Sequence, residues 1–218
     1  MSNIFLIGAT GGVGSRLGPK LVGAGHSVKG LHRKPEQAGD LRDQGVEPVF
    51  GNLIEMTADD MASALQGCDT AVFSAGAAGS GRDKTTAIDG EGPEKLIEAA
   101  RATGVNRIYM VSVIMDAGRD RDTSDDFEHY MAMKRRADAA LATSGIDYVI
   151  LRPGTLKDED DDGKVCAGRA ITYGDVARGN VAATLAELID TPEITNEIIE
   201  LTNGETPITE AVARLKRG

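Results

Sequence analysis

Short apolar runs alternate along the chain with longer stretches in which apolar residues recur every three or four positions. The short runs predict strands, and the longer stretches predict amphipathic helices. Strands are expected at Ile4–Ile7, Ser27–His32, Pro48–Gly51, Thr70–Ser74, Arg107–Ser112, Tyr148–Leu151 and Glu197–Leu201. Helices are expected at Val13–Ala24, Pro35–Gln44, Ala58–Leu65, Thr86–Thr103, Asp126–Thr143 and Tyr173–Ile189. Such regular alternation predicts an α/β fold, in which a doubly wound parallel sheet carries helices on both faces.

The second half of the chain is less regular. The stretch Thr155–Ile171 has no clear periodicity and contains the acidic run Asp158–Asp162. That run lacks the glycine turn and the spaced ligands of a calcium loop, so we expect a solvated, mobile loop. No internal repeat or linker divides the chain. We therefore expect a single domain over residues 1–218, with a small C-terminal lobe from about residue 153.

Composition narrows the class of protein. The chain has 218 residues, of which 41% are hydrophobic, and a formal net charge of -10. The length allows a sizeable core, and the acidic balance argues against nucleic acid as a partner. No apolar stretch approaches the roughly 18 residues of a membrane helix, and the N-terminus has no basic, cleavable leader. Two distant cysteines and three scattered histidines offer neither a disulfide framework nor a metal site. We expect a cytoplasmic protein that binds no metal and no membrane.

A glycine-rich turn follows the first expected strand, where the segment Gly8–Gly14 reads GATGGVG. A side chain at the spaced glycines would block the tight turn, the approach of a pyrophosphate, or the packing of helix on strand. The N-terminus of the next helix then offers free N–H groups and a partial positive charge to phosphates. This arrangement predicts a Rossmann-type fold that binds a dinucleotide. The residues assigned to the cofactor here are Gly8, Thr10, Gly11, Gly12, Val13 and Gly14.

The end of the second strand indicates which dinucleotide is bound. NAD enzymes usually place Asp or Glu there against the ribose 2′-hydroxyl, but this chain has Arg33 followed by Lys34. The planar guanidinium of Arg33 can bracket a 2′-phosphate, so we predict NADP(H). The ends of the third and fourth strands should contact the adenine edge and the ribose. The residues expected there are Asn52, Leu53, Ser74, Ala75 and Gly76.

A tyrosine and a lysine stand four positions apart on the long helix after the fifth strand. This spacing places Tyr130 and Lys134 on one helix face. Reduction of a carbonyl needs an acid that protonates the developing alkoxide, and a free tyrosine is only a weak proton donor. A nearby ammonium stabilises tyrosinate, so we expect Lys134 to lower the pKa of Tyr130 and strengthen it as an acid.

The chain resembles the short-chain dehydrogenase/reductase superfamily, and more closely its small atypical, NmrA-like branch of NAD(P)-binding proteins. The motifs that carry the resemblance are Gly8–Gly14, Arg107–Ser112, Tyr130 with Lys134, Asp147–Gly154 and Leu201–Ile208. The resemblance covers nearly the whole chain. It implies that Tyr130 donates the proton and that Lys134 holds the nicotinamide ribose.

Two further assignments depend on this resemblance. The family's substrate-binding serine usually comes one or two places later than Ser112, where this chain has Val113 and Ile114. Ser112 either takes over that catalytic role or only satisfies backbone groups at a strand end. The turn at Pro153 and Gly154 is expected beside the nicotinamide amide, as in the family.

Three functions are compatible with these residues. The first is an NADPH-dependent oxidoreductase that reduces a small carbonyl compound, with Tyr130 as proton donor and the lobe after Pro153 on the substrate side. The second is a non-catalytic NADP(H) sensor, which the departure at the serine position favours. The third, nucleotide-sugar epimerisation, is disfavoured because the sugar enzymes that it resembles carry a much larger C-terminal domain. We expect a monomer or a homodimer.

Overall fold

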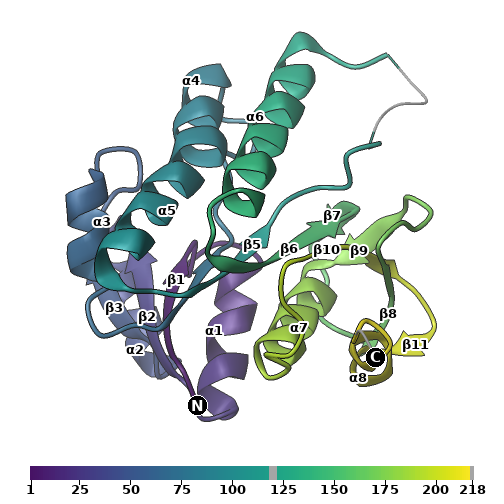
Figure 1. The fold of residues 1–218 in the computed structure, drawn as a ribbon, viewed down its shortest axis with the longest axis horizontal. Coiled ribbons are helices and arrows are strands. Elements are labelled where there is room, and N and C mark those ends of the chain that lie inside the picture. Colours follow the sequence, from purple (N-terminus) through teal and green to yellow (C-terminus); the bar gives the residue numbers. More distant parts are fainter. Residues whose placement is uncertain (118–121, 217–218) are drawn as a thin grey trace.

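A computed structural model describes residues 1–117 and 122–216 of the protein (Figure 1). The strands are β1 (Asn3–Ile7), β2 (Ser27–His32), β3 (Glu47–Phe50), β4 (Thr70–Phe73), β5 (Arg107–Val111), β6 (Asp147–Pro153), β7 (Thr155–Lys157), β8 (Lys164–Gly168), β9 (Asp175–Ala177), β10 (Glu197–Asn203) and β11 (Thr206–Pro207). The helices are α1 (Gly14–Gly23), α2 (Gln37–Asp43), α3 (Ala58–Ala64), α4 (Arg82–Thr85), the π-helix η1 (Thr86–Glu91), α5 (Gly92–Thr103), α6 (Asp125–Ala142), α7 (Arg178–Ile189) and α8 (Ile208–Ala213).

One large sheet organises the fold. Its strand order is β11-β8-β10-β6-β5-β4-β1-β2-β3. The pairs from β3 across to β10 are parallel, whereas β8 runs antiparallel to β10 and β11. The chain leaves β1 toward β2 and β3 and then returns to β4 on the other side of β1. Ligands of open α/β sheets bind at such a reversal of strand order, outside the carboxyl ends of the strands.

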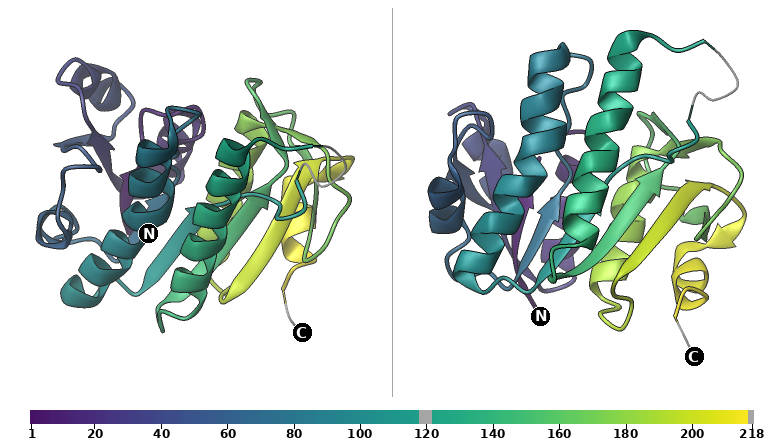
Figure 2. Two further views of the ribbon diagram at one scale, coloured as in Figure 1. Left: turned by 90° about the horizontal axis from the view of Figure 1, so that it is seen from above. Right: turned by 45° about the horizontal axis from the view of Figure 1, so that its top comes forward.

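Helices cover both faces of the sheet (Figure 2). On one face, α1 and α7 pack side by side in a core that includes Leu17, Leu21 and Leu185. On the other face, α3, α5 and α6 enclose a second core that includes Met61 and Leu96. Apolar residues of both sheet faces are therefore buried, which explains why the central strands read as continuous apolar runs. The predicted doubly wound α/β fold is confirmed.

The segment before α7 differs from the prediction. A helix was expected from Tyr173, but residues Asp175–Ala177 form β9, which pairs in parallel with β7. The backbone N–H of Thr155 donates to the carbonyl of Gly174 at 3.0 Å. A Cβ on Gly154 would lie 1.9 Å from that same carbonyl oxygen, so the two backbone segments are too close for a side chain at position 154. This pairing with a distant part of the sequence holds residues 175–177 in an extended conformation, and helix α7 therefore begins only at Arg178.

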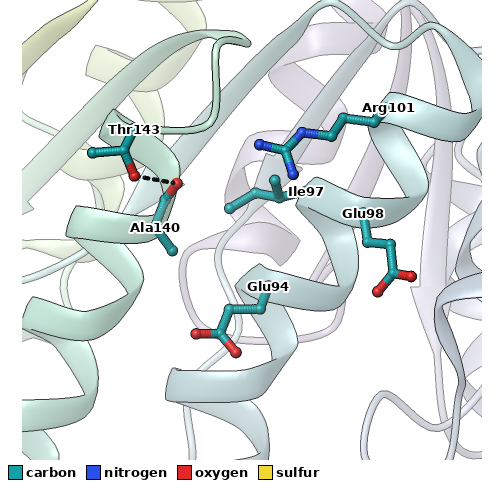
Figure 3. Close-up of a pocket in the computed structure, with 6 residues that line it drawn as sticks. All are labelled: Glu94, Ile97, Glu98, Arg101, Ala140 and Thr143. Carbon is teal, nitrogen blue, oxygen red and sulfur yellow. Dashed lines mark hydrogen bonds between the residues drawn. The ribbon is translucent and has the colours of Figure 1, made fainter.

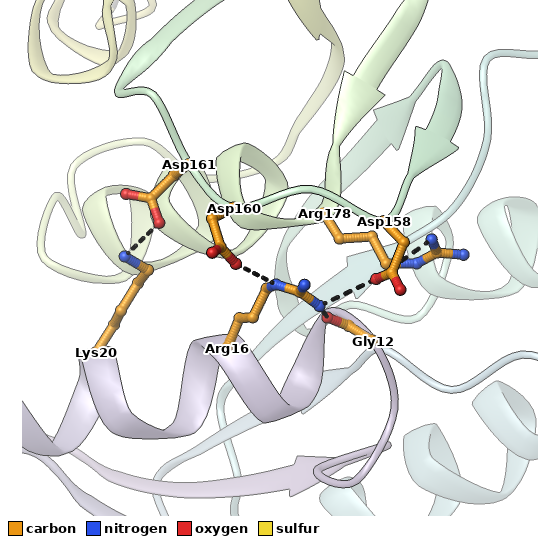
Figure 4. Close-up of polar contacts among 7 residues, drawn as sticks. All are labelled: Gly12, Arg16, Lys20, Asp158, Asp160, Asp161 and Arg178. Carbon is orange, nitrogen blue, oxygen red and sulfur yellow. Dashed lines mark hydrogen bonds and ion pairs between the residues drawn. The ribbon is translucent and has the colours of Figure 1, made fainter.

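The region after Pro153 contributes to two sheets. Strand β10 extends the large sheet by pairing in parallel with β6, and β8 continues it on the outer side. Strands β7 and β9 form a separate two-stranded sheet. The expected acidic loop lies between β7 and β8. Its carboxylates are exposed, as expected of a solvated loop, and three of them make ion pairs to α1 that the sequence did not predict (Figure 4).

Within residues 1–117 and 122–216, no helix combines the length and the apolar character needed to cross a membrane.

Candidate functional site

The glycine-rich turn connects β1 to α1 and is packed against the end of β4. Gly8 has φ of +87°, a left-handed conformation that favours glycine. A Cβ on Gly8 would lie 2.7 Å from the backbone nitrogen of Ala75, and one on Gly14 would lie 2.0 Å from the carbonyl oxygen of Gly8. Both glycines are therefore required by close backbone contacts. The N–H of Gly11 donates to the Gly8 carbonyl at 2.9 Å and closes the turn.

The remaining residues of the turn differ in how accessible they are to a ligand. Thr10 and Gly12 are exposed, whereas Val13 is buried under the start of α1. No acidic residue stands in the first turn of α1, so its N-terminus keeps its partial positive charge. The Ser74 hydroxyl donates to the Ile7 carbonyl at 3.0 Å and fixes β4 to β1 beside the turn. This geometry fits the pyrophosphate of a dinucleotide.

The residues predicted to contact the adenosine half are divided between surface and core. Arg33 is exposed at the end of β2 and is thus accessible to a ligand. The side-chain oxygen of Asn52 accepts a hydrogen bond from the Ile54 N–H at 3.2 Å, which leaves its amide N–H groups for a base edge. Leu53 is only 8% exposed and belongs to the core with Phe73, so its side chain is structural.

Tyr130 and Lys134 lie together on α6, as the spacing predicted. The Lys134 ammonium stands 5.8 Å from the centroid of the Tyr130 ring. It also makes a buried ion pair with Asp89 of η1, in which the Nζ–Oδ1 distance is 3.0 Å. The second oxygen of Asp89 accepts from the backbone N–H of Ala77 at 3.0 Å. Asp89 therefore connects Lys134 to the loop after β4, beside exposed Gly76.

The electrostatics of this group differ from the prediction. Burial raises the pKa of Tyr130 above its ordinary value; Lys134 lowers it, but Asp89 raises it again. Burial lowers the pKa of Lys134, yet Tyr130 and Asp89 raise it, and the net direction is upward. Lys134 therefore acts in the predicted direction, but burial outweighs its effect and Asp89 opposes it, so the net pKa of Tyr130 is raised and not lowered. At neutral pH the raised pKa values of both groups favour their protonated forms, a neutral phenol at Tyr130 and an ammonium at Lys134.

Ser112 lies at the end of β5, close to a second buried ion pair. Its N–H donates to the Leu151 carbonyl at 2.7 Å, and it is 5% exposed. Asp138 of α6 accepts from Arg152 Nε at 2.9 Å. Burial raises the pKa of Asp138, while Ser112 and Arg152 lower it. Ser112 is therefore near Asp138, one helical turn beyond Lys134, and its catalytic role stays a prediction.

The turn at Pro153 and Gly154 is buried where β6 meets β10. The Gly154 N–H donates to the Leu201 carbonyl at 2.9 Å, and the Pro153 carbonyl accepts from Ile114 at 3.1 Å. Next to this turn, the hydroxyl groups of Thr155 and Tyr173 lie 2.6 Å apart. Tyr173 is 40% exposed and close enough to Tyr130 to raise its pKa. The exposed ring of Tyr173 thus lies at the rim of the candidate site.

A surface pocket of about 430 Å³ lies elsewhere, between α5 and α6 (Figure 3). Its lining residues are Glu94, Ile97, Glu98, Arg101, Ala140 and Thr143. None of them belongs to the glycine-rich turn or to the group around Tyr130. We therefore place the candidate site at the carboxyl ends of β1, β4, β5 and β6, and not in this pocket.

Sequence reasoning did not find Asp89 or Tyr173. A signal for Asp89 was present, because its acidic side chain interrupts the apolar face of an expected helix in the run Thr86-Ala87-Ile88-Asp89. A carboxylate on a buried face is almost always paired, which indicates a hidden cation. Tyr173 gave no such signal, since it was assigned to a helix that does not form there.

The glycine turn at the sheet's reversal point, with α1 following it, defines a dinucleotide-binding protein of the Rossmann type. Residues 8–192 match the NAD(P)H-binding family. The chain is 38% identical over 214 residues to the Bacillus subtilis protein named uncharacterized sugar epimerase YhfK, covering 97% of this chain and 99% of that one. The protein therefore belongs to the NAD(P)H-binding family, and its expected cofactor is a nicotinamide dinucleotide.

Two solved structures are similar over nearly the full length. A putative NAD-dependent epimerase/dehydratase from Bacillus halodurans has a TM-score of 0.90 at 34% identity, covering 98% of this chain and 100% of that one. The oxidoreductase ylbE from Lactococcus lactis has a TM-score of 0.84 at 28% identity, covering 98% and 96%. Both structures support the assignment to Rossmann-type NAD(P)-binding proteins.

Proposed function

We propose that this protein is an NADPH-dependent oxidoreductase that reduces a small carbonyl compound. The observation that carries the proposal is the group formed by Tyr130, Lys134 and Asp89. It brings a phenol and a fixed, charge-balanced ammonium to the same sheet edge as the dinucleotide turn. The oxidoreductase named among the similar structures is consistent with this assignment.

The residues around the site have distinct tasks in this proposal. The nicotinamide, when bound, supplies hydride to the carbonyl carbon. Tyr130 then donates its phenolic proton to the carbonyl oxygen, and its raised pKa keeps that proton in place at neutral pH. Lys134 remains charged, stabilises the tyrosinate left behind, and is positioned to hold the nicotinamide ribose. Ser112 is the candidate for orienting the substrate carbonyl.

Oxidation of NADPH by the purified protein, followed spectrophotometrically with a panel of small aldehydes, ketones and quinones, tests the proposal. We expect turnover with at least one class of carbonyl and NADPH binding without any substrate. Tight NADPH binding with no turnover across the panel would overturn the proposal and favour the NADP(H) sensor.

The name of the Bacillus subtilis relative makes sugar epimerisation a second candidate. An epimerase regenerates its nicotinamide cofactor in every cycle, so incubation with a nucleotide sugar would change the sugar while total NADPH stayed constant. Net consumption of NADPH in proportion to product distinguishes the reductase from it.

Replacing Arg33 by Ala is expected to weaken NADPH binding about tenfold while leaving NADH binding unchanged. The reason is the loss of charge-assisted hydrogen bonds between an exposed guanidinium and the 2′-phosphate, which NADH lacks. Titration of each cofactor by its fluorescence measures both dissociation constants. Equal losses for the two cofactors would show that Arg33 does not read the 2′-phosphate.

A further inference from the structure

Two arginines flank the glycine-rich turn, and both are held by the acidic loop (Figure 4). Arg16 of α1 donates from Nη1 to the Gly12 carbonyl at 2.8 Å and lies 3.3 Å from Asp158 Oδ1. Arg178, the first residue of α7, lies 3.8 Å from that same carboxylate oxygen. One exposed aspartate therefore contacts two cations at the edge of the cofactor turn, and Arg16 has a second carboxylate partner in Asp160, 3.3 Å from its Nε.

The side chain of Arg178 crosses directly over Gly12. A Cβ on Gly12 would lie 2.6 Å from Arg178 Cδ and 2.8 Å from its Nε. The guanidinium thus reaches the exposed part of the turn, where the dinucleotide phosphates are expected. A side chain at position 12 would displace the flexible end of this arginine, whereas the contacts at Gly8 and Gly14 are with backbone atoms.

The backbone of the acidic loop is fixed in place beside α7. The N–H of Gly179 donates to the Glu159 carbonyl at 3.0 Å, and a Cβ on Gly179 would lie 2.1 Å from the backbone nitrogen of Asp161. Buried Asn180 donates to Asp162 Oδ1 at 2.9 Å. The loop backbone is therefore held in a position that brings the Asp158 carboxylate close to both arginines.

We propose that Arg178 binds the pyrophosphate of the cofactor and that Asp158 is an internal competitor for it. The carboxylate of Asp158 is 76% exposed and its contact to Arg178 is long, so this ion pair is weak. A phosphate offers the guanidinium stronger, charge-assisted hydrogen bonds. Cofactor binding thus exchanges a weak pair for a stronger one, while Arg16 stays bonded to the turn. The inference rests on the nicotinamide cofactor of the family and not on the carbonyl chemistry.

Dissociation constants of NADPH and NADH, measured by fluorescence with the full-length protein, test this exchange. We expect Asp158→Asn to bind both cofactors about two- to fivefold more tightly. Arg178→Ala should bind both about tenfold more weakly, because the pyrophosphate is common to them. Asp161→Asn is the matched control: it removes the same charge from the same loop, but its carboxylate pairs with Lys20 at 3.0 Å. It should change affinity less than Asp158→Asn does.

Each outcome bears on the proposal. Unchanged or weaker binding by Asp158→Asn, or equal gains in both loop variants, would overturn the role of Asp158 as a competitor. Unchanged binding by Arg178→Ala would overturn the phosphate contact, and a loss confined to NADPH would place Arg178 on the 2′-phosphate instead. A gain of affinity cannot come from misfolding, so tighter binding by Asp158→Asn could not be explained by a folding defect. Because the readout is binding, it stays valid if no carbonyl substrate is turned over.

Discussion

Replacing Tyr130 by Phe is expected to lower kcat for carbonyl reduction by about 10²–10⁴-fold, the usual contribution of a positioned general acid. The aromatic ring stays, so its contact with Phe127, at 6.3 Å between centroids, and its place beside Lys134 are retained. Only the phenolic hydroxyl group, and with it the transferable proton, is removed. Steady-state oxidation of NADPH with the best substrate of the panel measures the loss.

The control for this variant is the dissociation constant of NADPH. The cofactor turn lies on β1 and α1, whereas Tyr130 lies on α6, so binding should change little. A variant that reacts as fast as the wild type would show that Tyr130 is not the proton donor. A variant that loses binding as strongly as turnover would place Tyr130 in the cofactor site instead.

The cofactor turn could be predicted from the sequence because its determinants are local. The spacing of Gly8, Gly11 and Gly14 follows from the geometry of a strand, a turn and a helix that are contiguous in the chain. The same holds for Tyr130 and Lys134, whose separation places them on one helix face wherever that helix packs. Local geometry therefore gave the fold class and the pairing of these two side chains.

The surroundings of that pair could not be predicted from local pattern. Asp89 reaches Lys134 from η1, a π-helical segment in a stretch that the sequence predicts as an ordinary helix. Which helix packs against α6, and in what rotation, depends on tertiary contacts. The pKa of Tyr130 also depends on tertiary contacts. The spacing to Lys134 predicted a lowered pKa, but burial and the carboxylate of Asp89, which is distant in sequence, make the net shift upward.

The partners of the acidic loop also could not be predicted from the sequence. A run of charged residues is usually solvated, and Asp158 and Asp160 are indeed exposed. Their partners, however, lie on α1 and at the start of α7, which come together only because both helices cover the same sheet face. The sequence placed the charges correctly but could not show what they face.

Replacing Asp89 by Ala is expected to lower the free energy of unfolding by about 3–5 kcal/mol, because a buried ammonium is left without its carboxylate. Asp89 is fully buried, and Lys134 is only 6% exposed. Urea unfolding followed by circular dichroism measures the loss. The matched control is the double variant Asp89→Leu with Lys134→Met, which removes both charges and should recover much of the stability. A double variant as unstable as the single one would assign the loss to packing.

The pH dependence of the unfolding free energy tests whether Asp89 stabilises the charged form of Lys134. In the wild type the pKa of Lys134 is raised above its ordinary value of 10.5, so its contribution to stability is complete below that pH. This contribution is lost only as the pH rises through the folded-state pKa of Lys134.

The variant Asp89→Asn removes the carboxylate that raises the pKa of Lys134, while burial continues to lower it. We therefore expect the pKa of Lys134 in this variant to fall below 10.5. The unfolded variant then binds more protons than the folded one between the two pKa values, so its stability rises with pH. The difference in unfolding free energy between wild type and variant should therefore narrow toward pH 10.5. A constant difference across the alkaline range would show that Asp89 does not hold the charge of Lys134.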